Sequence, residues 1–239
     1  MRAVDSNLFV LSAELDHELD DYRARIPALH KTDAIEFRAP VTIFIGENGS
    51  GKSTLIEAIA IAAGFNPEGG SKNFLFETTR RDSELDPLVH LIRAPRRPSD
   101  GYILRAESFF NVATEIDRLG VTRGYGGQSL HEQSHGEAFM ALLLNRFLGD
   151  GLYVLDEPEA ALSPMRQLSM LARIHDLVRG GSQFVIATHS PILMAYPNAT
   201  LLLMERDIRE VAYEETEHYT VMRDFLNHRE VMLRELFST

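Results

Sequence analysis

The chain lacks cysteine altogether, and this absence excludes several kinds of site. Without a thiol there can be no disulfide, no thiolate zinc site and no cysteine nucleophile. Long apolar runs are missing too, because none approaches the roughly 20 residues that a membrane-spanning helix needs. The first residues lead into acidic sequence without an apolar segment, so no secretory signal is visible. We therefore expect a cytoplasmic protein without membrane insertion.

Positive charge is also scarce. The 239 residues contain 24 Lys and Arg against 35 Asp and Glu, which gives a net charge of −11. This balance argues against a uniformly basic surface for nucleic acid, although a local basic groove is compatible with it. Basic residues concentrate at Arg80-Arg81 and at Arg93 to Arg97, and most such runs are solvated faces. A nucleic-acid partner is therefore possible but unsupported.

The most informative segment that is present reads G-E-N-G-S-G-K-S and fits the phosphate-loop pattern G-x-x-x-x-G-K-[ST]. An apolar β-branched run precedes it at Val41 to Ile45, and helix-forming residues follow it at Leu55 to Ala63. A strand, a glycine loop and a helix N-terminus together direct backbone N–H groups at an anion. We predict that this loop binds the phosphates of ATP, with the lysine on the β- and γ-phosphates and the following serine on Mg²⁺. The predicted nucleotide-binding residues are Gly46, Glu47, Asn48, Gly49, Ser50, Gly51, Lys52, Ser53 and Thr54.

Two further apolar strands end in polar side chains. Leu152 to Leu155 runs into Asp156 and Glu157, and Phe184 to Ala187 is followed by Thr188 and His189. Phosphoryl transfer needs neutralised charge and an oriented nucleophile. We therefore expect Asp156 to lie near the metal, Glu157 to face the attacking water, and His189 to bond the γ-phosphate.

In this order, the motifs resemble the ATP-binding-cassette superfamily. The segment Gln133 to Glu137 is similar to the family's signature L-S-G-G-Q, with Ser134 and Gly136 at the two most telling positions. His135 and Glu137 depart from that pattern, and Ser163 stands where transporters usually carry the D-loop aspartate. D-E-P-E-A-x-L-x-P with T-H-S-P is closer to soluble AAA-type and SMC-related ATPases.

The resemblance implies a slow, Mg²⁺-dependent ATPase in which two copies clasp two ATP molecules head to tail. Lys52, Glu157 and His189 would then act from one subunit, and Ser134 and Gly136 from the other. The family's Q-loop corresponds to the junction near Glu107, which becomes a candidate metal contact. The adenine could stack on Phe37 or His30, although each is more simply a core or loop residue.

The apolar patterns predict a single α/β domain of P-loop type with a mixed, mainly parallel sheet flanked by helices. We expect a core lobe of residues 1–106 and 149–239, and an inserted helical lobe of residues 107–148. The Met and aromatic residues of a C-terminal helix from about Tyr219 are predicted to pack. Two other functions stay open: the nucleotide-binding subunit of a membrane transporter, and a nucleotide-gated module in DNA maintenance or defence.

Overall fold

The computed structural model describes residues 8–17, 26–66, 69–71 and 89–238. A six-stranded sheet forms the centre, in the order β5-β6-β7-β3-β8-β9. All its neighbouring strands are parallel except the last pair, β8 and β9. The predicted α/β class with a mainly parallel sheet is confirmed. The strands are β3 (Val41–Ile45), β5 (Asp100–Arg105), β6 (Gly151–Asp156), β7 (Gln183–Ala187), β8 (Thr200–Met204) and β9 (Ile208–Glu210).

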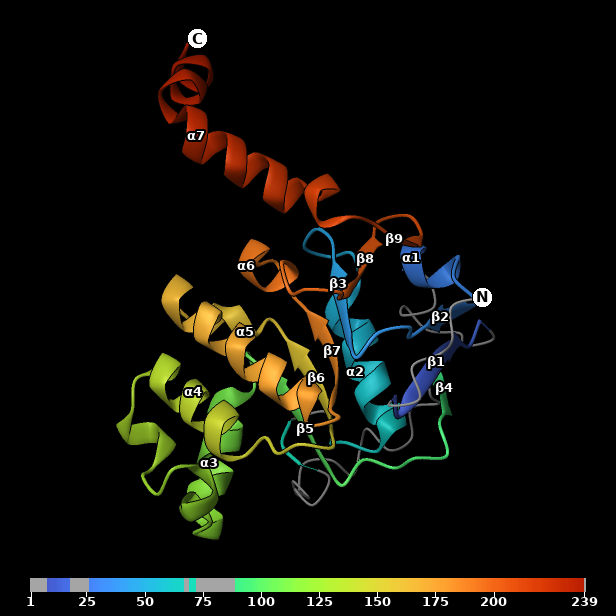
Figure 1. Ribbon diagram of the computed structural model, residues 1–239, viewed down its shortest axis with the longest axis vertical. Helices are drawn as coiled ribbons and strands as arrows, with labels where there is room; N and C mark the ends of the chain where they lie inside the picture. Colours follow the sequence, from blue (N-terminus) through green and yellow to red (C-terminus); the bar gives the residue numbers. More distant parts are fainter. Residues whose placement is uncertain (1–7, 18–25, 67–68, 72–88, 239) are drawn as a thin grey trace.

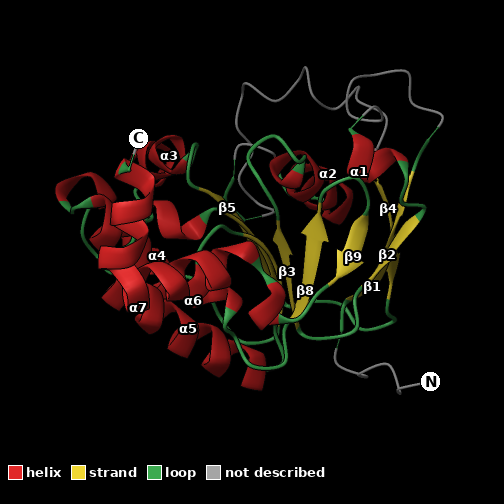
Figure 2. Cartoon of the chain, turned by 90° about the horizontal axis from the view of Figure 1, so that it is seen from above, coloured by secondary structure: helices red, strands yellow, loops and turns green. Residues whose placement is uncertain are grey.

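Both faces of this sheet are buried, as the near-continuous apolar strands require. Side chains on β6 alternate, so that Val154 packs on one side of the sheet and Tyr153 and Leu155 on the other. Helix α2 (Lys52–Ala63) covers the first side, and α5 (Pro164–Arg179) covers the second. Figure 2 shows α2 and α5 on opposite sides of the strands.

A second, antiparallel sheet has the order β2-β1-β4, which the sequence did not reveal. Its strands are β1 (Val10–Leu15), β2 (Ala34–Glu36) and β4 (Val89–Arg93). The fully buried side chain of Gln183 on β7 joins it to the central sheet. Its Oε1 accepts from the backbone N–H groups of Phe9 and Val10, at 2.8 and 3.0 Å. The amide of Gln183 therefore supplies partners that this edge of β1 would otherwise lack.

Between β5 and β6 the chain forms a helical region, which lies on the left in Figure 1. Helix α3 spans Phe109–Leu119, and α4 (His135–Asn145) begins directly after Ser134. Short helical turns complete the described elements: α1 (Pro27–His30), η4 (Thr122–Tyr125), η5 (Leu130–Glu132), η6 (Pro158–Ala161), α6 (Pro191–Met194) and η7 (Tyr213–Glu215).

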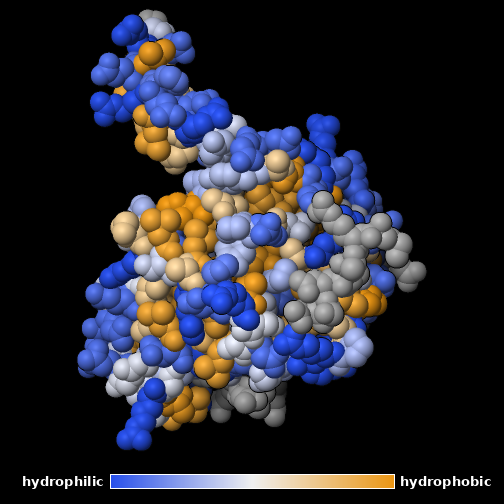
Figure 3. Space-filling view, in the orientation of Figure 1, coloured by the Kyte–Doolittle hydropathy of each residue, from blue (hydrophilic) through white to orange (hydrophobic). Residues whose placement is uncertain are grey.

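Helix α7 (Glu217–Phe237) projects from the body and has a non-helical residue at His228. The expectation that its large apolar side chains pack is wrong for the chain as it folds here. No residue of α7 is buried, and Phe237 is 75% exposed. Figure 3 shows apolar and polar residues mixed along the projecting helix. The spacing of apolar residues was correct for a helix, but beyond the first turns of α7 no neighbouring element in the described part of the chain covers its apolar side.

Candidate nucleotide site

The phosphate loop follows β3 and opens α2. Gly51, at φ 97°, precedes the helix, and a side-chain Cβ there would lie 2.7 Å from Cγ2 of Ile26. Glycine is therefore required by both conformation and space. The Nζ of Lys52 donates to the backbone carbonyls of Gly46 and Glu47, at 2.9 Å each. Burial lowers the pKa of Lys52, and these two carbonyls hold its ammonium group against the loop.

Asp156 meets the loop at the carboxyl end of β6. Strand register sets Asp156 beside Ala187 on one side and Arg105 on the other. The hydroxyl of Ser53 donates to Oδ1 of Asp156 at 3.2 Å. Burial raises the pKa of Asp156 to about 6, while the guanidinium of Arg105, with its Nε 3.8 Å from Oδ2, opposes this shift.

These oxygen donors fit Mg²⁺. The ion prefers hard oxygen ligands, and in phosphate sites it is held by one or two protein groups plus phosphates and water. The hydroxyl of Ser53 and the carboxylate of Asp156 form such a pair. The described residues contain no cluster of three or more His, Cys, Asp or Glu that would hold a metal alone.

Glu157 adopts a left-handed backbone conformation, with φ 48° and ψ 50°. Its N–H donates to the carbonyl of Ala187 at 2.9 Å, which ties the end of β6 to β7. Its carboxylate Oε1 lies 3.6 Å from Nε2 of His189. The N–H of His189 is in turn held at 2.6 Å by Oε1 of Glu159, whose pKa burial raises. The predicted catalytic side chains of Glu157 and His189, which follow β6 and β7, thus face each other.

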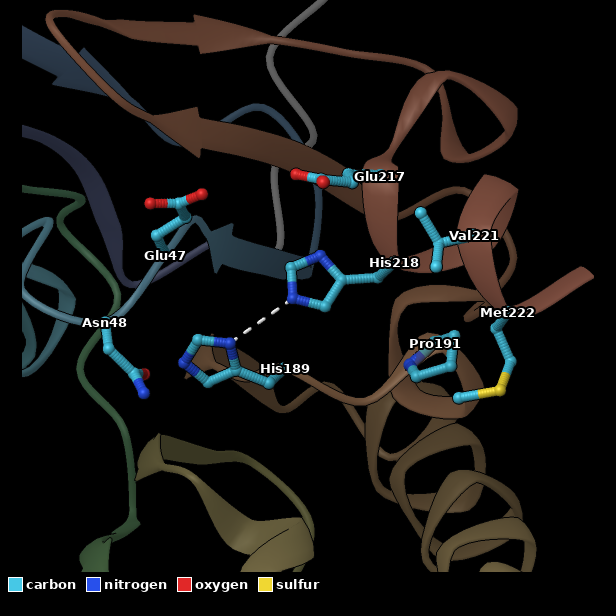
Figure 4. Close-up of a pocket in the computed structure, with 8 residues that line it drawn as sticks. All are labelled: Glu47, Asn48, His189, Pro191, Glu217, His218, Val221 and Met222. Atoms are coloured by element: carbon cyan, nitrogen blue, oxygen red, sulfur yellow. Dashed lines mark hydrogen bonds between the residues drawn. The ribbon is translucent and has the colours of Figure 1, made fainter. Parts of the chain in front are cut away.

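Helix α7 closes one side of this region. A cavity of about 490 Å³ lies between its first turns, the phosphate loop and His189. Figure 4 shows His218 of α7 pointing at His189, with Asn48 beyond it. Nδ1 of His189 lies 3.3 Å from Nε2 of His218. The residues that line the cavity are Glu47, Asn48, His189, Pro191, Glu217, His218, Val221 and Met222.

The predicted signature segment lies apart from the loop, in the left-hand region of Figure 1. Ser134 caps α4: its hydroxyl accepts from the N–H of Glu137, and the carboxylate of Glu137 accepts from the N–H of Ser134. Gly136 packs closely on η6, because an added Cβ would lie 2.8 Å from the carbonyl oxygen of Ala161. The first turn of α4 is therefore packed against the segment that follows Asp156 and Glu157.

Of the remaining predicted residues, some lie near the site and others do not. Glu107 comes within 3.8 Å of Arg105, so it lies near Asp156, but its side chain is 83% exposed. Phe37 is buried in the core, whereas His30 is exposed at the end of α1. Arg96 is bonded to Asp150 and lies over the ring of Phe9.

Arg80-Arg81 lies outside the described residues. In the other basic run, Arg93 to Arg97, the side chain of Arg96 is engaged within the protein by Asp150 and the ring of Phe9.

Three residues at the site were missed from the sequence: Arg105, Glu159 and His218. Arg105 could have been found, since it ends the strand paired with β6 and lies directly opposite Asp156. Glu159 could also have been found, because it is a third carboxylate only two residues after Glu157. His218 had none, because it belongs to a distant helix.

Two family models match the chain. An AAA-domain model matches residues 26–107. A second AAA-domain model, whose description names an AbiEii toxin of a type IV TA system, matches residues 123–195. Between them, they cover the phosphate loop, the signature segment and the strand-end motifs. The chain is therefore similar to P-loop ATPases of the AAA-domain type.

Two of the curated relatives that match this chain are named as ATP-binding proteins of import or transport systems. A ribose/galactose/methyl galactoside import ATP-binding protein of Agrobacterium fabrum is 28% identical over 79% of the chain, which spans 41% of that relative. The manganese transport system ATP-binding protein MntA of Synechocystis is 25% identical over 81% of both chains. The chain thus spans less than half of the first of these relatives.

Solved structures show the same fold. CbiO1 from Clostridium perfringens, part of the ABC transporter complex cbiONQ, superposes with a TM-score of 0.51 at 17% identity, covering 95% of this chain and 99% of CbiO1. A nucleotide-free ATP-binding cassette from an ABC transporter gives 0.50 at 18% identity, covering 94% and 98%. Among the described residues, no helix is long and apolar enough to cross a membrane.

Proposed function

We propose that this chain hydrolyses ATP with Mg²⁺ in the cytoplasm, and that two copies close head to tail on two nucleotides to do so. The observation that carries the proposal is the contact between the Ser53 hydroxyl of the phosphate loop and the Asp156 carboxylate, 3.2 Å apart. A glycine loop alone binds phosphate. A loop serine bonded to a strand-end carboxylate, with Glu157 next in sequence, also provides the metal position and the base that hydrolysis needs.

Each side chain has a role that its position supports. The loop N–H groups and Lys52 hold the β- and γ-phosphates once the ammonium exchanges its carbonyl partners for phosphate oxygens. Ser53 and Asp156 would hold Mg²⁺, with Glu107 as a further candidate, and the bound ion would supply charge neutralisation between the phosphates. Glu157 orients and deprotonates the attacking water.

The second copy completes the site. Ser134 and Gly136 stand at the N-terminus of a capped helix, where N–H groups and the helix dipole favour an anion. In Figures 1 and 2 this helix lies to one side of the chain's own loop and α2, so a partner's helix is the better candidate for the γ-phosphate. We assign the core lobe to residues 1–106 and 149–239, and the signature lobe to residues 107–148.

The test is the variant Glu157→Gln. It should retain ATP binding, lose most turnover and accumulate as a dimer in Mg²⁺ and ATP, measured by gel filtration with light scattering. The matched control is Glu14→Gln, an exposed glutamate on β1, which should match the parent. Parental turnover in Glu157→Gln would refute the assigned base. Specific activity that is flat across a wide dilution series would refute dimeric catalysis.

A transporter subunit is a second candidate, favoured by the import and transport names of the curated relatives. Co-purification of the Glu157→Gln variant in ATP with a membrane protein would support it. The description of the second family model instead favours a defence module. Hydrolysis stimulated by DNA and lost steeply with added salt would support that candidate.

A further inference from the structure

Helix α7 contributes a histidine to the nucleotide site. His218 lies in the first turn of the helix, 29 residues beyond His189 in the sequence, and its Nε2 is 3.3 Å from Nδ1 of His189. The two ring centroids are 5.5 Å apart and the planes meet at 51°, so the contact is made edge to edge through nitrogen and not by stacking. One proton must lie between these two nitrogens for a hydrogen bond to form.

The carboxylate beside His189 determines which of the two rings carries that proton. The other nitrogen of His189, Nε2, is buried without a hydrogen-bond partner among the described residues, and Oε1 of Glu157 lies 3.6 Å away. A lone pair on Nε2 would repel the carboxylate, whereas an N–H there is attracted to it. Nε2 therefore carries the proton, Nδ1 carries the lone pair, and Nε2–H of His218 donates to it.

This choice of tautomer matters for the proposed reaction. Figure 4 shows the free nitrogen of His189 directed toward Asn48 of the phosphate loop, where the terminal phosphate of ATP would lie. Phosphate oxygens accept hydrogen bonds only, so the histidine must present N–H on that side. With the opposite tautomer it would present a lone pair to an anion. A neighbour that donates to Nδ1 keeps the donor facing the ligand.

We propose that His218 is a positioning residue, which fixes the ring of His189 in the Nε2–H tautomer for contact with the γ-phosphate. The inference rests on the proposed ATP hydrolysis for its catalytic consequence, although the tautomer itself does not. It gives α7 a function at the site: the C-terminal helix, and not the two-lobed core alone, completes the nucleotide contacts of the subunit.

Kinetics test the consequence. His218→Leu removes the donor to His189 and should lower kcat roughly tenfold, because the hydrogen bond from His189 to the charged γ-phosphate is then lost from the transition state, with little change in KM for ATP. His218→Gln places an amide N–H near the same position and should restore kcat to within about threefold of the parent. In a His189→Ala background, His218→Leu should have no further effect, because its route of action is gone.

Nitrogen-15 spectra of histidine-labelled protein test the tautomer directly, without nucleotide or turnover. His189 should show a protonated Nε2 and an unprotonated Nδ1. The reverse assignment overturns the inference, and so does an unchanged kcat in His218→Leu or a loss that persists in the His189→Ala background. If the parent hydrolyses no ATP, the proposed function fails, while the spectra still decide the role of His218.

Discussion

Replacing Asp156 with asparagine should make the nucleotide-free protein more stable. The carboxylate is 5% exposed, and burial raises its pKa to about 6. In the unfolded chain the same group titrates near pH 4, a difference of about two pKa units, or about 3 kcal/mol. The asparagine side chain would carry no charge to desolvate, and Arg105 would keep Glu57, 3.3 Å away, as a partner. The stabilisation in Asp156→Asn therefore has an upper limit of about 3 kcal/mol.

The sign of the pH dependence follows from linkage. A raised carboxyl pKa means that the folded state binds the proton more tightly between pH 4 and 6, so the parent loses stability as pH rises through that window. The penalty is complete above about pH 7, about half as large at pH 5, and absent below pH 4. The advantage of Asp156→Asn should follow the same course.

Thermal unfolding at pH 5 and pH 8, without nucleotide or Mg²⁺, measures the effect. At pH 8 the variant should melt up to about 6 to 12 °C above the parent, since a chain of this size shifts by about 2 to 4 °C per kcal/mol. The control is Asp207→Asn, an exposed residue between β8 and β9, which should stay within about 0.5 kcal/mol of the parent. A variant less stable than the parent at pH 8, or a gain independent of pH, would refute the reasoning.

Three other variants test separate parts of the structure. Gly136→Ala should cost about 1 kcal/mol, because overpacking against the carbonyl of Ala161 outweighs the gain in helix propensity, while Gly124→Ala, with open space around it, should be neutral in urea unfolding. Lys52→Ala should abolish the thermal stabilisation by ATP, about 2.7 kcal/mol at a hundredfold excess over Kd in the parent; an undiminished shift would contradict the loop's role. Gln183→Leu should cost about 3 kcal/mol in urea, since it leaves two buried N–H groups without an acceptor; a loss below about 1 kcal/mol would count against that bond.

Most of the central fold could be predicted from local sequence patterns. The strand at Val41–Ile45 has the predicted bounds, because its apolar run and the glycine loop that ends it are contiguous in the sequence. The antiparallel sheet escaped prediction, since β1 pairs with β4 across a long stretch of sequence. The exposure of α7 was not predicted either, because periodicity identifies the apolar side of a helix but not whether another element covers it.

The candidate site shows the same division. Lys52 and Asp156 could be read from short motifs, and the structure lays them at one edge of the sheet as parallel strands require. Arg105 lies opposite Asp156 only because of strand register. His218 reaches the site through the path of the chain after β9, which no local pattern records. Site residues that belong to a short motif could be recognised in the sequence, whereas those that the topology brings to the site could not.

The left-handed backbone at Glu157 has a consequence for anyone who engineers this protein. A residue with a Cβ pays about 1 to 2 kcal/mol for that conformation, and glycine adopts it freely. Directed evolution for heat resistance alone would therefore favour glycine here and discard the carboxylate. A selection of this chain for thermal stability therefore needs a turnover screen at every round, because it would otherwise converge on stable variants that do not hydrolyse ATP.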